Sequence, residues 1–117
     1  MNDNAWDKFV DWWTECDEDE ISKNEFLWFA YQTMWLHNEV LNGGYDQFFD
    51  NKEDYWNMRK TSKLFKKYLP KDMFAQFSLA LKAHKRGKSC EEYTRSYNEE
   101  AMQTFLEELA KKVVSLI

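Results

Sequence analysis

The fold is decided by residues 21–51, which read ISKNEFLWFAYQTMWLHNEVLNGGYDQFFDN. Residues at steps of three and four share one face of a helix there: Phe26, Phe29, Ala30, Thr33, His37 and Val40. Trp28, Tyr31 and Trp35 line the opposite side. This spacing predicts a helix, and a helix that is apolar on both sides is normally buried at the centre of a domain. We therefore expect a central helix at about residues 23–41.

Both ends of this helix carry sequence signals. Ser22 and Glu25 have the spacing of a capping box, in which each side chain satisfies a backbone N–H of the first turn, so the helix should start near Lys23. The Asn-Gly-Gly sequence at residues 42–44 predicts its end, because glycine adopts the positive φ of a helix C-terminus without a steric clash. We expect one of the two glycines to have positive φ and residues 45–51 to fold back as a short helix.

Apolar stripes predict further helices in the rest of the chain, and no stretch alternates as a strand would. The expected helices cover about residues 3–16, 52–69 with Asn51 as the cap, 70–86 and 98–116, with a short one near 89–97. A chain of 117 residues fits one domain, residues 1–117. We expect an all-α fold, a compact bundle of five to seven helices around the central one. The expected core residues are Trp13, Phe29, Val40, Phe65, Phe77 and Phe105.

Residue types that carry chemistry are few and isolated. Cys16 and Cys90 lack the spacing of metal ligands, and His37 and His84 stand alone on helical stripes, where a histidine is usually a satisfied core residue. The sequence contains no nucleophile elbow, phosphate-binding loop, HExxH or CxxC motif. We expect no catalytic residue, no metal and no cofactor. The chain should be non-enzymatic, with a small hydrolase as the most remote alternative.

The sequence also favours a cytoplasmic location. Its first residues, MNDNAWDKF, lack the basic start and apolar run of a signal peptide. No segment approaches the roughly 18 consecutive apolar residues of a membrane span. Two cysteines cannot supply the several disulfides of a small secreted scaffold. We expect no membrane contact, and the oligomeric state is not indicated.

Charge is distributed unevenly along the chain. The net charge is −5, yet residues 1–58 contain 14 acids and 3 bases, whereas residues 59–88 contain 10 bases and 1 acid. Acids recur every four residues in the predicted first helix, and a run of four acids follows. These residues are Asp3, Asp7, Asp11 and Glu15, then Asp17, Glu18, Asp19 and Glu20. Like charges at this spacing destabilise an isolated helix by roughly 0.2–0.5 kcal/mol per pair, so local stability does not explain the row. Either solvation or contact with a basic partner surface would explain it, and the run at residues 17–20 is consistent with a solvated linker.

The basic residues between Arg59 and Lys67 fall on the outer side of the predicted helix at 52–69. Clustered Lys and Arg side chains can bind a phosphate backbone. The protein as a whole is acidic, however, and its other segments would repel nucleic acid. Direct binding of nucleic acid is therefore disfavoured, and a solvated helix face accounts for the cluster.

Residues 39–51 resemble the signature of a bacterial family named after DNA mimic protein 19. That signature is an acidic residue, Asn-Gly-Gly, two residues, Gln, two aromatics and a nearby Asn; the matching positions after Glu39 are Asn42, Gly43, Gly44, Gln47, Phe48, Phe49 and Asn51. The resemblance implies an all-helical fold, and the member that gave the family its name is an acidic protein taken to occupy DNA-binding surfaces of other proteins. We interpret the motif as structural: the glycines make the turn, the aromatics pack it, and Gln47 and Asn51 satisfy backbone groups.

Two kinds of protein-binding function remain open. The first is an acidic interaction protein, a DNA mimic or inhibitor, whose acidic residues occupy the basic surface of a nucleic-acid-binding protein. The second is a toxin-neutralising or phage-defence-related module that uses exposed aromatics such as Trp12 and Trp56. Both are non-enzymatic, and both require a protein partner.

Overall fold

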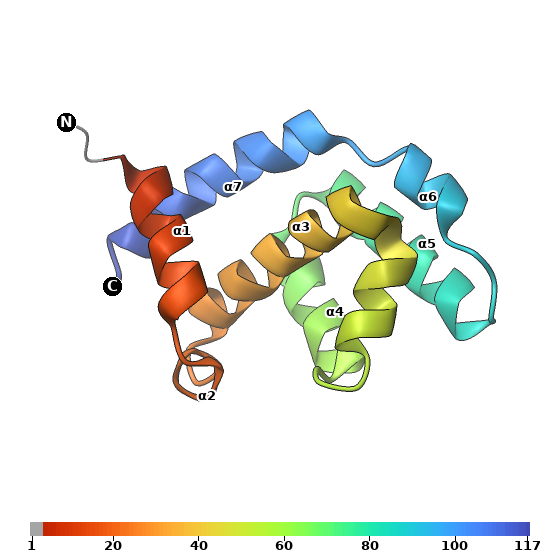
Figure 1. Cartoon of the computed structure of the whole chain (residues 1–117), viewed down its shortest axis with the longest axis horizontal. Coiled ribbons are helices and arrows are strands. Elements are labelled where there is room, and N and C mark those ends of the chain that lie inside the picture. Colours follow the sequence, from red (N-terminus) through yellow and green to blue (C-terminus); the bar gives the residue numbers. More distant parts are fainter. Residues whose placement is uncertain (1–3) are drawn as a thin grey trace.

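A long helix, α3 (Glu25–Lys52), runs through the middle of the molecule, and the other helices pack around it (Figure 1). The structure is a computed structural model and describes residues 4–117. Within that range it contains seven helices and no strand, which confirms the predicted all-α bundle around a central helix. The other six helices are α1 (Ala5–Glu15), α2 (Glu18–Ile21), α4 (Met58–Tyr68), α5 (Lys71–Lys85), α6 (Glu91–Arg95) and α7 (Glu99–Val114).

Helix α3 begins at Glu25 and not at Lys23. Its N-cap is Asn24, whose side-chain oxygen accepts a hydrogen bond from the backbone N–H of Leu27 at 3.1 Å. The predicted capping box is not formed, because the acidic run before it is itself a short helix, α2, and Ser22 donates its hydroxyl to a carbonyl of that helix. The predicted start was therefore wrong, since an upstream helix competes for the capping serine.

Helix α3 changes direction sharply at Gly44, where φ is +84° and ψ is 178°. Figure 1 shows its first part, residues 25–43, rising through the centre and its second part, residues 45–52, turning back. The predicted positive φ and the folded-back helix are thus confirmed, with Gly44 as the glycine that provides the bend. A side chain at this φ would be strained, so the bend depends on glycine.

Helix α4 begins later than predicted, because the Asn51 side chain bonds to Glu39 across the bend and does not cap a helix. The second part of α3 continues to Lys52, and a turn follows before α4 begins at Met58 with Asn57 as its N-cap. The Asn57 side chain accepts from the backbone N–H of Lys60 at 3.1 Å. Asn51 caps nothing, because its side chain is used inside α3. The predicted helix at 52–69 was therefore wrong at its beginning.

Residues in and before α6 hold the bend from outside. Thr94 Oγ1 accepts a hydrogen bond from the backbone N–H of Tyr45 at 3.0 Å, and an Asp46 carboxylate oxygen accepts from the backbone N–H of Cys90 at 3.0 Å. The kink interrupts the regular bonding of the helix, so the Tyr45 N–H needs a partner from elsewhere. Two parts of the chain that are distant in sequence therefore build the bend together.

A cluster of aromatic rings on α3, α4 and α5 lies in the core, and α7 adds aliphatic residues to it. The rings of Phe65 and Phe77 meet edge to face with centroids 4.8 Å apart, and Phe29 packs on Phe65. Of the six predicted core residues, these three and Val40 are buried. The other two, Trp13 on α1 and Phe105 on α7, are half-buried and cover this core from helices at its edge.

We predict that Gly44→Ala lowers the free energy of unfolding by about 1 kcal/mol or more, because alanine is strained at positive φ. The new Cβ would also lie 2.8 Å from Thr94 Oγ1, the acceptor of the Tyr45 N–H. Urea titrations of the variant and the wild type measure the difference.

The matched control is Gly87→Ala. Gly87 also has positive φ, at 71°, but a Cβ there would meet no atom within 4 Å. The Gly87→Ala variant should therefore show only the effect of backbone strain, and its free energy of unfolding should fall less than that of Gly44→Ala. A Gly44→Ala protein as stable as the wild type would show that the bend does not need glycine.

Candidate functional site

The motif at residues 39–51 forms a hydrogen-bonded clamp across the bend of α3. Glu39 lies on the first part of the helix and is buried, with 8% of its surface exposed. Its Oε1 accepts a hydrogen bond from Gln47 Nε2 at 2.6 Å, and its Oε2 accepts one from Asn51 Nδ2 at 2.8 Å. Both donors come from the second part, so the clamp ties the two parts together. The prediction that these amides satisfy backbone groups was wrong, because a buried carboxylate requires donors of its own.

The other motif residues also have roles in folding. Phe48 and Phe49 are fully buried and pack against Phe77 of α5, as the sequence predicted. Gly43 leaves room for the clamp, because a Cβ there would collide with the side-chain amide of Gln47. Asn42 is exposed. The motif is therefore a device of the fold, and its side chains are mostly committed to internal contacts.

A half-buried cation lies near the clamp. Lys52 Nζ is 3.6 Å from the centroid of the Trp35 ring and 5.1 Å from that of Trp56. Burial lowers the pKa of Lys52, while the negative charges of Glu39 and Glu18 oppose that shift. The ammonium group thus offsets part of the buried charge of Glu39 and is itself stabilised by the aromatic rings.

The acidic row lies on the outer side of α1, where the helical spacing predicted it. Asp7, Asp11 and Glu15 are exposed, and none of the ion pairs found among residues 4–117 includes them. Asp3, the first member of the predicted row, lies outside the described residues. Phe9 on the inner side of α1 is fully buried and anchors the helix. The carboxylates are therefore displayed on a helix that is already held in place.

The following run of acids is an ordered helix and not the linker that the sequence suggested. Asp17 is the N-cap of α2, and Glu18 accepts a hydrogen bond from the Tyr31 hydroxyl at 3.0 Å. Burial raises the pKa of Tyr31 to about 12, and the charge of Glu18 adds to that shift, so the hydroxyl stays a donor at neutral pH. We call the described acids of α1 and α2 the acidic face: Asp7, Asp11, Glu15, Asp17, Glu18, Asp19 and Glu20.

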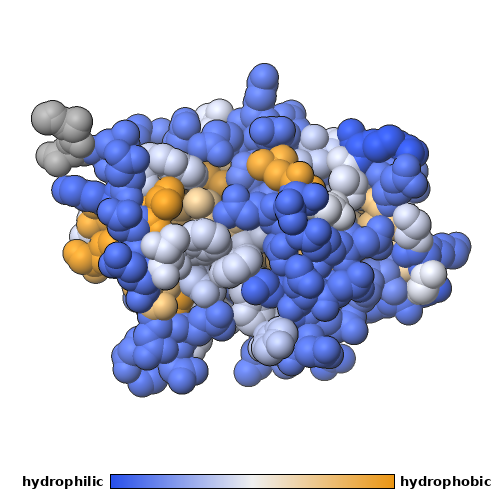
Figure 2. Space-filling model, viewed as in Figure 1, coloured by the Kyte–Doolittle hydropathy of each residue, from blue (hydrophilic) through white to orange (hydrophobic). Residues whose placement is uncertain are grey.

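The aromatics expected at the surface are largely internal. Trp56 is 5% exposed and packs against Trp28 and Phe48, so the prediction of an exposed Trp56 was wrong. The backbone N–H of Trp56 bonds to the carbonyl of Lys52 at 2.8 Å, and this turn folds the ring back toward α3. Trp12 is half-buried, with its ring stacked on the ring of Phe9. Figure 2 shows a mostly hydrophilic face on which hydrophobic residues form small separate patches.

The basic cluster on α4 is exposed as predicted. Its members are Arg59, Lys60, Lys63, Lys66 and Lys67. Lys67 forms an ion pair with Glu25 at the start of α3, and the hydroxyl of Tyr68 donates to the same carboxylate. The acidic face and the basic cluster thus occupy different helices, and the charge asymmetry of the sequence is also an asymmetry in space.

Both histidines have hydrogen-bonding partners in the described part of the fold. His37 is 3% exposed, and its Nδ1 lies 2.8 Å from the hydroxyl of Tyr97. Burial lowers the pKa of His37 and raises that of Tyr97. His84 contacts the Glu53 carboxylate and stacks on the ring of Phe49.

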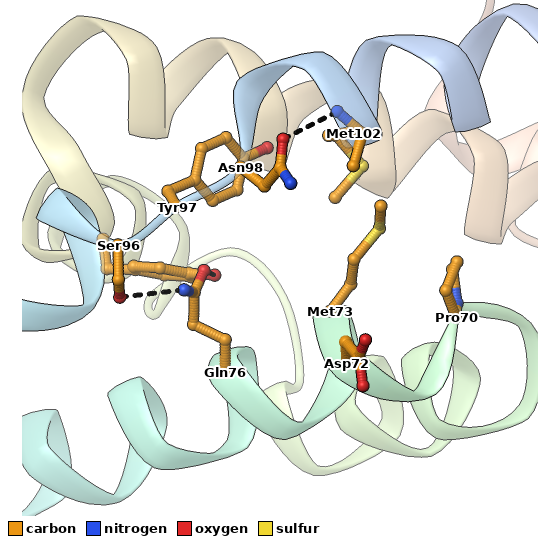
Figure 3. Close-up of a pocket in the computed structure, with 10 residues that line it drawn as sticks. Pro70, Asp72, Met73, Gln76, Ser96, Tyr97, Asn98 and Met102 are labelled. Carbon is orange, nitrogen blue, oxygen red and sulfur yellow. Dashed lines mark hydrogen bonds between the residues drawn. The ribbon is translucent and has the colours of Figure 1, made fainter.

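A mainly apolar pocket lies between the bend of α3, the start of α5 and the junction of α6 with α7 (Figure 3). Its volume is about 360 Å³. No local pattern in the sequence predicted it, because its walls come from three separate segments that meet only in the folded chain. Among residues 4–117, no group of three or more His, Cys, Asp or Glu side chains is arranged to hold a metal.

Comparisons of the chain with protein-family models, with curated proteins and with solved structures gave no match. None of the helices between residues 4 and 117 combines the length and apolarity that a membrane crossing requires.

We predict that Glu39→Gln lowers the free energy of unfolding by about 1–3 kcal/mol, since the new amide group would face another donor at a buried site. The substitution keeps the shape of the side chain while removing an acceptor from either Gln47 or Asn51. Chemical denaturation measures the loss. Asp50→Asn makes the same charge change at an exposed acid on the second part of α3 and should be close to neutral. Equal effects of the two substitutions would refute the clamp.

We also predict that His37 makes stability depend on pH. Burial holds its folded pKa below the ordinary value of 6.5. The unfolded chain therefore binds the proton more readily, and the contribution of His37 is present above about pH 6.5 and lost as the pH falls through the lower folded pKa. Urea unfolding measured from about pH 7.5 to about pH 5 should show a steeper decline for the wild type than for His37→Gln. Parallel curves for the two proteins would contradict this assignment.

Proposed function

We propose that this chain is a non-enzymatic interaction protein whose acidic face binds the basic surface of a nucleic-acid-binding protein. The observation that carries the proposal is the row of Asp7, Asp11 and Glu15, which are exposed and belong to none of the ion pairs found among residues 4–117. Repelling carboxylates at this spacing do not help the helix that carries them. A cationic partner would relieve that repulsion.

The spacing of the row supports partial mimicry of a nucleic-acid backbone. Four residues of α-helix advance about 6 Å, and successive phosphates of one DNA strand advance about 3.4 Å. The row therefore offers one carboxylate for roughly every second phosphate. The acids of α2 continue the negative charge beyond the end of α1.

Preorganisation of the acidic face supports binding as well. Phe9 anchors α1 in the core, and the hydrogen bond from Tyr31 to Glu18 ties α2 to α3. A partner would not have to order either helix, so little conformational entropy would be lost on association. The negative field over the same helices would speed the encounter with a basic surface.

The resemblance of residues 39–51 to the DNA mimic protein 19 signature agrees with this proposal, but it supports the fold more than the function. The motif residues are occupied by the clamp and by core packing. The toxin-neutralising alternative is less favoured, because Trp56 is buried and Trp12 is half-buried. Both proposals place the chain in the cytoplasm with a protein partner.

The experiment is affinity capture from lysate of the native host, with the wild type and a charge-neutralised variant as baits. The variant carries Asp7→Asn, Asp11→Asn and Glu15→Gln. We expect the wild type to retain DNA-binding proteins that added duplex DNA displaces, and the variant to lose at least 90% of them, on the order of a tenfold loss of affinity. Salt should weaken capture, because exposed charges are screened beyond about 8 Å at physiological ionic strength.

A second variant separates the acidic face from net charge. Asp50→Asn, Asp54→Asn and Glu92→Gln remove three exposed acids from other parts of the surface. This control should capture the same proteins as the wild type. The proposal fails if the α1 variant, shown to be folded by circular dichroism, captures the same proteins as the wild type, or if both variants lose them equally.

A further inference from the structure

The pocket shown in Figure 3 has the size and the lining of a site for a small molecule. Its volume of about 360 Å³ falls within the range of roughly 300–1,000 Å³ that is usual for such sites. Helix α5 supplies Met73, the start of α7 supplies Met102, and the loop between α6 and α7 supplies Tyr97 and Asn98. The acidic face lies on other helices, so the pocket is separate from the protein-binding surface proposed above.

The body of the pocket is apolar and polarisable. Figure 3 shows the side chains of Met73 and Met102 pointing toward one another across the cavity, with the ring of Tyr97 to one side. Thioether groups are flexible and adapt to the shape of a bound molecule. Sulfur and aromatic faces also interact well with a planar ring or with a cation.

Most polar atoms of the lining already have partners. The hydroxyl of Tyr45 donates to Gln76 Oε1 at 2.8 Å, and Gln76 Nε2 donates to Ser96 Oγ at 3.1 Å. Asn98 Oδ1 accepts from the backbone N–H of Ala101 at 2.9 Å. These bonds fix the walls of the pocket, and burial keeps the pKa of Tyr45 raised so that its hydroxyl stays neutral.

Two polar groups of the lining remain available to a ligand. Asn98 Nδ2 is directed toward the cavity in Figure 3. The carboxylate of Asp72 is exposed at the edge of the pocket beside Met73 and belongs to none of the ion pairs found among residues 4–117. The site therefore offers one neutral donor and one negative charge.

Charge near the pocket favours a cationic ligand over an anionic one. Glu99 follows Asn98 directly, and its negative charge adds to the effect of burial in raising the pKa of Tyr97. The nearest bases in sequence are exposed Lys71, which is not part of the lining, and Arg95, which pairs with Glu91. The only charged side chain among the described residues of the lining is therefore the carboxylate of Asp72, which places a negative charge at the edge of the pocket.

We propose that this pocket binds a small apolar amine, with its ammonium group at Asp72 and its aromatic or branched body between Met73, Met102 and Tyr97. An anion of the same size would meet the carboxylate of Asp72 and would be repelled. The ligand is a free small molecule, because the pocket is too small for more than a single ring system and its substituent.

The test uses methionine methyl groups as reporters. The full chain is labelled with ¹³C at the methionine methyls and titrated with tryptamine as the probe, and in parallel with indole-3-acetate, an anion with the same ring. Met73 and Met102 report on the pocket, while Met34, which is buried, and Met58, on α4, serve as internal controls. Asp72→Asn removes the proposed charge, and Asp54→Asn makes the same change at an exposed site in the turn before α4.

We expect tryptamine to shift the Met73 and Met102 signals with saturation, at a dissociation constant of about 1 mM or below. Asp72→Asn should weaken this binding about threefold or more, as for loss of an accessible ion pair, and Asp54→Asn should not. Indole-3-acetate should bind more weakly than tryptamine to the wild type. If tryptamine caused no saturable shifts of the Met73 and Met102 signals, the pocket would not be a binding site. If tryptamine bound Asp72→Asn as tightly as the wild type, or if indole-3-acetate bound the wild type as tightly as tryptamine, the preference for amines would be refuted.

Discussion

The reversal of α3 at Gly44 is the constraint on which the rest of the molecule depends. Positive φ at this glycine turns residues 45–52 back against the bundle, and this brings Phe48 and Phe49 into the core beside Phe77. The carboxylate of Glu39 holds the reversal by accepting both amides of the second part. The bend leaves the backbone N–H of Tyr45 without a partner in its own helix, and this group donates to Thr94, so the position of α6 is tied to the bend. One wall of the apolar pocket is formed by the same tyrosine.

Much of this architecture could be predicted from apolar periodicity, because large side chains at helical spacing have one efficient way to be buried. The helices, the central position of α3 and the core status of Phe29, Phe65 and Phe77 follow from that rule. Helix caps were less predictable. Ser22 and Asn51 were suitable caps by local sequence, but α2 uses the first and the buried carboxylate of Glu39 uses the second. Tertiary contacts therefore determined which of several suitable polar residues capped each helix.

The parts of the candidate site that depend on local helix geometry could be predicted, and the parts that depend on tertiary contacts could not. The exposure of Asp7, Asp11 and Glu15 follows from helix geometry, since they lie opposite the stripe that contains Phe9. The pocket does not follow from any local rule, because Met73 and Met102 meet across a space defined by three segments. Trp56 was misplaced for a related reason: a single turn after α3 determines whether its ring faces solvent or the core.

The pairing of α1 with α7 has a consequence for how the protein acquires its acidic surface during synthesis. Figure 1 shows these two helices packed together, although α7 follows every other described helix in the chain. At roughly 5–20 residues per second, the ribosome would need on the order of 10 seconds after finishing α1 to complete α7. Until then α1 lacks its main neighbour, and its carboxylates have no fixed arrangement in space. The α1 part of the acidic face is therefore fixed in place only after α7 has been made, whereas the α2 part depends on contacts with α3.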